Sequence, residues 1–449
     1  MKHILIITCL LSGIALKGFS QQAASDSTTY NFTVADCINY AYAHQDSVVN
    51  AGLGVKSAEY NVKETVGKGL PQISGVASFQ DYLKIPTTLI PGEFFNQPGT
   101  FIPLKFGVKY QSNLSLAASQ ILFDPDYLVG LQARKTYRDL YDRSYTRSKI
   151  TASVNVTKAY YQILVSIEQL RILQEDIDQL KLQVDETAAR NKQGFVEKID
   201  VDRITVQYNS LVTKKENTVR LLSLNYELLK FQMGMPIENN LTLKDKLESV
   251  QLEASANDAM ADTAIYHSRI EYNLLETQEK LYEYDVKRKK GQFLPKLTAN
   301  ASYAASYQND NFGKLYHTNF PSSYFGLTLN VPIFTGFQHV NQLRQSQITL
   351  LKSQNDLFDV KNALNLELKK SRIIYLNGLQ TLNDQKKNRA LAEDVLRVSK
   401  IKYEQGVGSS LEVIQAQTAL QDADNTYIQG LYDALVSKVD LDKAYGRIK

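Results

Sequence analysis

The sequence is poor in the residues that most often carry redox or metal chemistry. It has two cysteines and four methionines among its 449 residues. Cys9 lies inside an apolar N-terminal stretch with no small-residue cleavage site just before it, which excludes a lipid anchor. Cys37 has no partner for an intramolecular disulfide, so its favoured role is a small buried apolar side chain. The four methionines offer no methionine-rich route for copper.

Catalytic and metal-binding motifs are also missing. The sequence has no glycine-rich phosphate loop and no Gly-x-Ser-x-Gly elbow. We therefore expect no enzyme activity, no cofactor and no metal site, and any energy source must lie in a partner protein. The five histidines are not spaced as metal ligands: His3, His44, His267, His317 and His339.

The N-terminus has the pattern of a secretory signal peptide. Lys2 precedes an apolar run from Ile4 to Leu16, and the small residues Gly18 and Ser20 follow it. The run is too short to span a bilayer, so we expect cleavage near Ser20. Loss of residues 1–20 removes two lysines and no acid, which lowers the formal charge from +4 to +2. A chain so close to neutral is not expected to bind nucleic acid.

No window after this leader holds the roughly 18 consecutive apolar residues that a transmembrane helix requires. A chain of this kind would cross a membrane as strands. Alternating apolar and polar residues predict strands that could form a lipid-facing barrel with a wet lumen. The edge of a soluble β-sandwich is the alternative that this pattern leaves open. The predicted strands lie at about 71–83, 104–118, 295–307 and 324–333.

Two parts of the chain resemble each other, which indicates an internal duplication. Three pairs of segments carry the match, at offsets of 212, 224 and 211 residues: Lys192-Gln193-Gly194 with Glu404-Gln405-Gly406, Gly69-Leu70-Pro71 with Phe293-Leu294-Pro295, and Leu122-Phe123 with Ile333-Phe334. The last two offsets give the first half about 13 extra residues, which we place in the loop from Ile85 to Pro103. Two tandem repeats are predicted, at 33–235 and 263–449.

Each predicted repeat ends in a long helical hairpin. Apolar residues recur in a heptad-like pattern over 163–184, 201–233 and 413–441. Helices at about 125–190 and 338–402 would each be on the order of 100 Å long. The hairpins are expected to turn near Gly194 and Gly406. A stripe of small residues on the last helix suits the close approach of a second helix: Ala416, Ala423, Gly430, Ser437 and Ala444.

Together these features resemble the TolC-like outer membrane factors, or outer membrane efflux proteins. The resemblance rests on the duplicated pattern, the Leu-Pro entry to each first strand, and the motif Tyr403-x-x-Gly406-x-x-x-x-Leu411-Glu412-Val413-x-x-Ala416-Gln417. It implies a mixed membrane protein, a homotrimer whose four strands per chain close a 12-stranded outer-membrane β-barrel. That barrel would continue into a long α-helical barrel in the periplasm, with residues 236–262 in a belt around it. Four strands alone would leave open edges in lipid, which agrees with the oligomer.

The resemblance also implies roles at the two turns. Glu412 matches one of two inward carboxylates that narrow the pore, and Gln415 stands at the second position. Three copies of Glu412 on the axis would attract cations, whereas the alternative is a solvated surface glutamate. Four residues match the periplasmic tips that dock an adaptor, where the glycines also serve as helix terminators: Gly194, Phe195, Gly406 and Val407.

A latch is implied beside this gate. Tyr403 matches the tyrosine that holds the closed tip, and Asp200 matches its acidic partner on the neighbouring hairpin. Gly408 stands where the family usually has an arginine. We therefore expect a weaker latch, or one that uses another base such as Arg203.

The implied function is a passive exit duct of a tripartite efflux or type I secretion system. Its partners would be a periplasmic adaptor (membrane fusion) protein, an inner-membrane pump of the RND or ABC type, and outer-membrane lipid. The residues do not decide between small molecules and proteins as cargo. The alternative is a periplasmic coiled-coil scaffold or adaptor without a pore. Two hairpins, each preceded by a pair of alternating strands, favour the channel.

Overall fold

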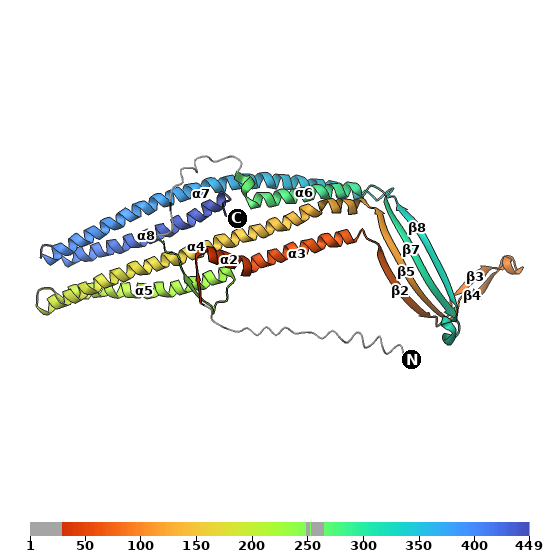
Figure 1. Ribbon diagram of the computed structural model, residues 1–449, viewed down its shortest axis with the longest axis horizontal. Coiled ribbons are helices and arrows are strands. Elements are labelled where there is room, and N and C mark those ends of the chain that lie inside the picture. The colour runs from red at the N-terminus through yellow and green to blue at the C-terminus, as the bar shows by residue number, and fades with distance from the viewer. Residues whose placement is uncertain (1–28, 248–251, 253–264, 449) are drawn as a thin grey trace.

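The computed structural model describes residues 29–247, 252 and 265–448. The expected signal peptide, 1–20, lies outside the described residues, as do 248–251 and 253–262 of the expected belt segment. The molecule is elongated, with long helices side by side at one end and a sheet at the other (Figure 1). The chain runs from helices into the sheet and back twice, so the same order of elements occurs in both halves.

The elements have the following bounds. The helices are α2 (Val34–His44), α3 (Asp46–Gly67), α4 (Pro125–Lys192), α5 (Lys198–Met233), α6 (Ile270–Gly291), α7 (Gln338–Glu404) and α8 (Ser410–Ala444), with short 3-10 helices at Gly92–Phe95, Ile265–Ser268 and Phe312–His317. The strands are β1 (Thr29–Phe32), β2 (Gln72–Asp81), β3 (Thr87–Pro91), β4 (Phe101–Lys105), β5 (Tyr110–Phe123), β6 (Asn240–Leu243), β7 (Lys296–Asn309) and β8 (Asn319–Asn330).

The four-stranded sheet has one apolar and one polar face. Its strands lie in the order β2-β5-β7-β8, with all neighbours antiparallel. On the polar face, Ser306 donates a hydrogen bond to Asn113 at 3.0 Å, and Asn300 donates one to Thr328 at 3.0 Å. The register places large exposed apolar side chains on the opposite face: Ile73, Phe79, Leu114, Leu116, Tyr303, Phe325, Leu327 and Leu329.

The expected strand at 104–118 is two separate elements. β4 ends at Lys105 and pairs with β3, whereas β5 begins at Tyr110 and pairs with β2 and β7. Gly107 between them has φ of 132°, which breaks the pleat. The alternation of apolar residues continues across this break, so the pattern could not reveal it. The loop from Ile85 to Pro103 holds most of the β3–β4 hairpin, Thr87–Lys105, which extends beyond the main sheet (Figure 1).

The last strand of the sheet begins earlier than expected. β8 starts at Asn319, five residues before the predicted strand at 324–333, and it includes Pro321. Proline has no N–H to donate, so it is tolerated in an edge strand. β8 is such an edge, because within the described residues it pairs only with β7.

Two helices of 68 and 67 residues, α4 and α7, connect the sheet to the far end of the molecule. Asp124 caps α4 by accepting the Asp126 N–H at 2.8 Å, and Pro125 occupies the first helical position. Lys296 of β7 binds both carboxylates at 3.1 and 3.0 Å, which ties the start of the helix to the sheet. Among the described residues, no helix combines the length and apolar character needed to cross a membrane.

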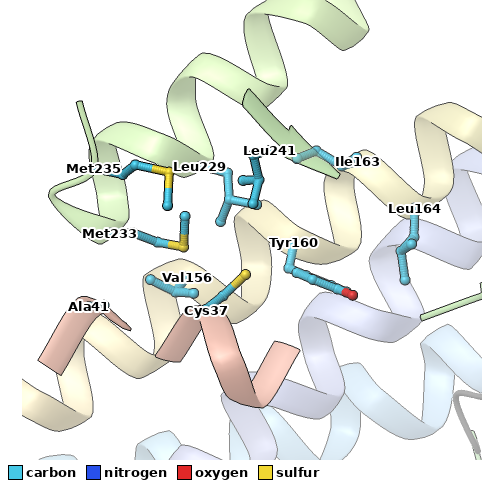
Figure 2. Close-up of a cluster of buried hydrophobic side chains, with 10 residues drawn as sticks. All are labelled: Cys37, Ala41, Val156, Tyr160, Ile163, Leu164, Leu229, Met233, Met235 and Leu241. Atoms are coloured by element: carbon cyan, nitrogen blue, oxygen red, sulfur yellow. The ribbon is translucent and has the colours of Figure 1, made fainter. Parts of the chain in front are cut away.

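The largest apolar core lies where the chain's N-terminal part meets the middle of α4. Cys37 and Ala41 of α2 face side chains of α4 and α5 (Figure 2). Cys37 is fully buried, as the sequence predicted, and this burial raises the pKa of its thiol to about 12. β1 pairs in parallel with β6, and Asp245 accepts hydrogen bonds from the Val34 N–H and the Tyr160 hydroxyl, both at 2.9 Å.

A buried cation joins the helices of the second half. Arg269 is 3% exposed and binds Glu271 of α6 and Glu367 of α7, each at 3.1 Å. Its guanidinium also donates to the carbonyl of Ala444 at the end of α8, at 3.3 Å. This side chain therefore connects three helices at the middle of the molecule.

Arg269→Ala is expected to lower the free energy of unfolding by about 3 kcal/mol, because it removes the buried cation between two partly buried carboxylates and leaves only the more distant Lys443, 3.7 Å from Glu367. Thermal unfolding of the purified protein measures this loss. The matched control is Arg397→Ala, which removes an exposed arginine of α7 paired with Asp394 at 2.6 Å; a change of at most about 0.5 kcal/mol is expected there. Equal losses in the two variants would contradict the role of Arg269.

Candidate functional site

The two helical hairpins end in the same backbone motif. We call α4 with α5 hairpin 1, and α7 with α8 hairpin 2. In hairpin 1, Gly194 (φ 80°) donates to the Asn191 carbonyl at 2.9 Å, and Phe195 donates to the Arg190 carbonyl at 3.0 Å. This pair of bonds around a left-handed glycine is a Schellman motif, which ends a helix.

The turn of hairpin 2 repeats this geometry. Gly406 (φ 74°) donates to the Tyr403 carbonyl at 3.1 Å, and Val407 donates to the Lys402 carbonyl at 3.0 Å. The two turns lie at the same end of the molecule (Figure 1). The side chains that follow the glycines, Phe195 and Val407, are 77% and 76% exposed. In this motif the corresponding side chain frequently packs against its own helix. Here both side chains are largely exposed, so both tips present an apolar side chain to solvent.

Gly408 cannot be replaced by arginine without a change in the turn. A Cβ added at this position would lie 2.9 Å from the Cβ of Lys402 and 3.1 Å from the nitrogen of Tyr403. The Gly408 N–H also donates to the Lys402 carbonyl at 3.1 Å. A side chain at position 408 would therefore require the tight turn after α7 to shift.

Asp200 connects the two hairpins, with Ser410 as its partner. The Ser410 hydroxyl donates to the Asp200 carboxylate, and the guanidinium of Arg203 lies 3.8 Å from the same oxygen. Ser410 and Arg203 are therefore the groups that hold Asp200 within one chain. A hydrogen bond between Tyr403 and Asp200 is absent from the described residues.

Tyr403 lies instead in a cleft between α4 and α7. Its ring is 5.8 Å from the Arg190 guanidinium, and its hydroxyl is buried with no hydrogen-bond partner among the described residues. Burial, and then the charge of Asp200, raise the pKa of this phenol, whereas Arg190 lowers it. The cleft of about 190 Å³ is also lined by Gln183, whose buried Oε1 has no partner within the described chain.

Sequence reasoning missed Arg190, Gln183 and Ser410. Arg190 and Gln183 are seven residues apart and share one face of α4, but polar residues in a heptad are indistinguishable from a solvated face. Ser410 lies in the Ser-Ser-Leu-Glu stretch that begins α8, where a helix cap was the visible signal. Ser409 caps α8 by accepting the Glu412 N–H at 3.2 Å.

Glu412 and Gln415 are both exposed on α8, three residues apart on one side of the helix. Within one chain they face solvent, so the axial ring of carboxylates stays a prediction. The described residues contain no cluster of three or more histidine, cysteine or acidic side chains placed to hold a metal ion.

A buried polar cluster joins the hairpins farther from the tips. Asp176 of α4 and Asp424 of α8 are 7% and 6% exposed and line one small cleft with Lys214 of α5. Arg389 of α7 binds Asp424 at 2.5 Å, whereas Asp176 has no ion pair within the described ranges. Burial, followed by the charge of Asp424, raises the pKa of Asp176 to about 7.

Gly406→Ala is expected to destabilise the tip by about 1 kcal/mol, because an alanine at positive φ is strained. Open space surrounds the added Cβ, so the strain lies in the backbone alone. Amide exchange of the Val407 N–H measures it, with about fivefold faster exchange expected for alanine. Gly406→Asn is the control, since asparagine tolerates the left-handed region better. If the Val407 N–H of Gly406→Ala exchanged at the wild-type rate, a requirement for this backbone conformation would be excluded.

The raised pKa of Asp176 predicts a loss of stability as pH rises. Its pKa in the folded protein is above the ordinary value of 3.8, so the native state holds a proton that the unfolded chain releases. Stability should therefore fall between about pH 4 and pH 7 and level off above that. Asp176→Asn should weaken this dependence and raise stability at pH 8 by at most about 4 kcal/mol; burial also raises the pKa of Asp424, so part of the dependence should remain. Thermal unfolding at pH 5 and pH 8 tests this, with the exposed Asp178→Asn as a control that should behave like wild type.

Comparisons with known proteins agree with this architecture. The family model described as outer membrane efflux protein matches residues 274–447. Outer membrane protein TolC of Salmonella enteritidis is 21% identical over 353 residues, which cover 75% of this chain and 70% of that protein. Alkaline protease secretion protein AprF and pyoverdine export outer membrane protein OpmQ, both of Pseudomonas aeruginosa, are 22% and 23% identical, covering 73% and 72% of this chain and 68% of each relative.

Solved structures show the same fold. CusC superimposes with a TM-score of 0.77 at 16% identity, covering 95% of both chains. VceC of Vibrio cholerae superimposes with a TM-score of 0.72 at 14% identity, covering 92% of this chain and 96% of that one. The paired hairpins, the amphipathic sheet and these matches together show that the chain has the fold of these channels and is similar to the outer membrane efflux proteins, of which TolC is an outer membrane protein.

Proposed function

We propose that the protein is a passive exit duct of the outer membrane, built as a homotrimer and gated at its periplasmic tip. The observation that carries this proposal is the four-stranded amphipathic sheet joined directly to two long helical hairpins. An apolar face that is exposed along all four strands suits lipid, and a polar face suits a wet lumen.

The edges of the sheet support the homotrimer. Within the described residues, β2 and β8 each pair on one side only, so their other backbone groups have no strand partner. Unpaired N–H and C=O groups in hydrocarbon are unfavourable by several kcal/mol each. If β8 of one chain pairs with β2 of the next, three chains close a barrel of twelve strands without edges.

Aromatic side chains at both ends of the strands support placement in a bilayer. Phe79 packs against Phe312 with ring centroids 5.9 Å apart at the end farther from the helices. At the strand-to-helix junctions, four exposed phenylalanines occur: Phe123, Phe293, Phe334 and Phe337. Paired belts of aromatic residues on either side of an apolar band are typical of strands that span an outer membrane.

The tips are the proposed gate and docking site. Phe195 and Val407 occupy equivalent positions in the two turns and expose apolar surface that an adaptor could cover. Glu412 begins the second return helix, where three copies would bring negative charge to the trimer axis. An adaptor and an inner-membrane pump of the RND or ABC type would supply the energy that a passive duct lacks.

The proposal names no cargo. AprF is named for secretion of alkaline protease and OpmQ for export of pyoverdine, and the two relatives are almost equally similar to this chain. A protein and a small molecule are therefore both compatible with the architecture. The scaffold alternative is disfavoured, because a periplasmic scaffold would leave the apolar face of the sheet in water.

The native mass of the particle extracted by detergent from outer-membrane fractions should equal three chains. The full-length protein is expressed, purified without crosslinking and measured by light scattering with the detergent contribution subtracted. Three chains are expected because that number closes the sheet. A monomer or dimer recovered from the soluble periplasmic fraction would refute the barrel and favour the scaffold.

A further inference from the structure

Side chains of the return helices α5 and α8 contact each other in one chain, in nearly equal register. Each contacting pair is separated by 210 or 211 positions, close to the offset of 212 between the sequence repeats. Each helix therefore contacts almost the equivalent of itself in the other half. Three pairs of side chains make these contacts: Ser410 with Asp200, Gln207 with Thr418 at 3.3 Å, and Lys214 with Asn425 at 2.5 Å.

A closed ring in which α5 and α8 alternate requires nearly equivalent residues of the two repeats to meet in this way. In a ring, α8 of one chain meets α5 of the next chain through the contact that α5 makes with α8 inside a chain. The expected pairs between chains follow from the repeat offset. Adding 212 to the residue number on α5 gives a position on α8, and subtracting 212 from the residue number on α8 gives a position on α5 of the next chain. This operation gives three pairs between chains: Glu412 with Lys198, Ala419 with Val206, and Thr426 with Thr213.

Two of the pairs obtained in this way are chemically complementary. A carboxylate meets an ammonium group, and Val206 meets another apolar residue. The third pair adds nothing to this match, because the hydroxyls of Thr213 and Thr426 already donate hydrogen bonds within the chain. All six residues are exposed in the single chain, including Val206, which is apolar and 69% exposed. The offset was derived from other residues and imposes no such match, so the complementarity is an independent observation.

We propose that Glu412 of one chain forms an ion pair with Lys198 of the next chain at the periplasmic tip, and that Val206 and Ala419 continue the same seam. The inference rests on the proposed homotrimer. It changes the expected ring of three bare carboxylates into a ring of three ion pairs. Contacts inside a chain, through Asp200 and Ser410, then alternate around the tip with contacts between chains, through Glu412 and Lys198.

Cysteine crosslinking tests the seam directly. The protein carrying Val206→Cys and Ala419→Cys is treated in outer-membrane fractions with a short bis-maleimide and examined on a denaturing gel. We expect covalent dimers and trimers. The matched control carries Gln207→Cys and Thr418→Cys, which lie in contact within one chain, so crosslinking should leave it at the monomer mass. Cys37 is buried and its thiol pKa is raised, so it does not compete for the reagent.

Charge reversal tests the ion pair by a second route. Lys198→Glu should lower the temperature at which the native particle dissociates at low salt, and adding Glu412→Lys should restore it. Lys192→Glu, at the exposed end of α4, is the control. Adding Glu412→Lys to this variant should not raise the temperature at which its native particle dissociates. The absence of rescue would reject the ion pair.

The outcomes separate this inference from the proposed function. Native mass of three chains together with Val206/Ala419 crosslinks between chains supports both. If the native mass equals three chains but the Val206→Cys/Ala419→Cys variant gives only monomers on the denaturing gel, the seam is refuted and the proposed duct is not. A particle of one chain refutes the homotrimer, and the seam falls with it.

Discussion

Backbone hydrogen bonding at the two edges of the four-stranded sheet is the constraint on which the rest of the structure depends. β2 and β8 have a pairing partner on one side only within the described residues, and the apolar face between them is exposed. A single chain can satisfy neither requirement by itself. In the proposed homotrimer, three chains that share edges satisfy both, and closure of the sheet would then fix where each helical hairpin stands.

Much of the helical architecture could be predicted from the sequence, because its signals are local. The long helices were expected at 125–190 and 338–402, and the structure has them at Pro125–Lys192 and Gln338–Glu404. Glycines end both, and positive φ at a helix end is a property of one residue and its neighbours. The strands were less predictable. The break at Gly107 is invisible to an alternation that continues on both sides of it.

The candidate site was predictable as positions and less so as contacts. Gly194 and Gly406 were placed by their own chemistry, whereas the partner of Asp200 depends on which helix lies beside it. That packing brings Ser410 to the carboxylate and leaves the Tyr403 hydroxyl facing a cleft with Gln183. A heptad pattern defines which face of a helix is buried, but it does not identify the neighbour that buries it.

The uninterrupted length of α4 and α7 has a consequence for the cell envelope. Neither helix contains proline after its first residue, so neither has the usual cause of a kink. Each is a stiff rod on the order of 100 Å long. If the sheet lies in the outer membrane as proposed, these helices hold the hairpin tips at a fixed distance from that membrane. In the proposed duct, a partner from the inner membrane would have to span the distance that remains.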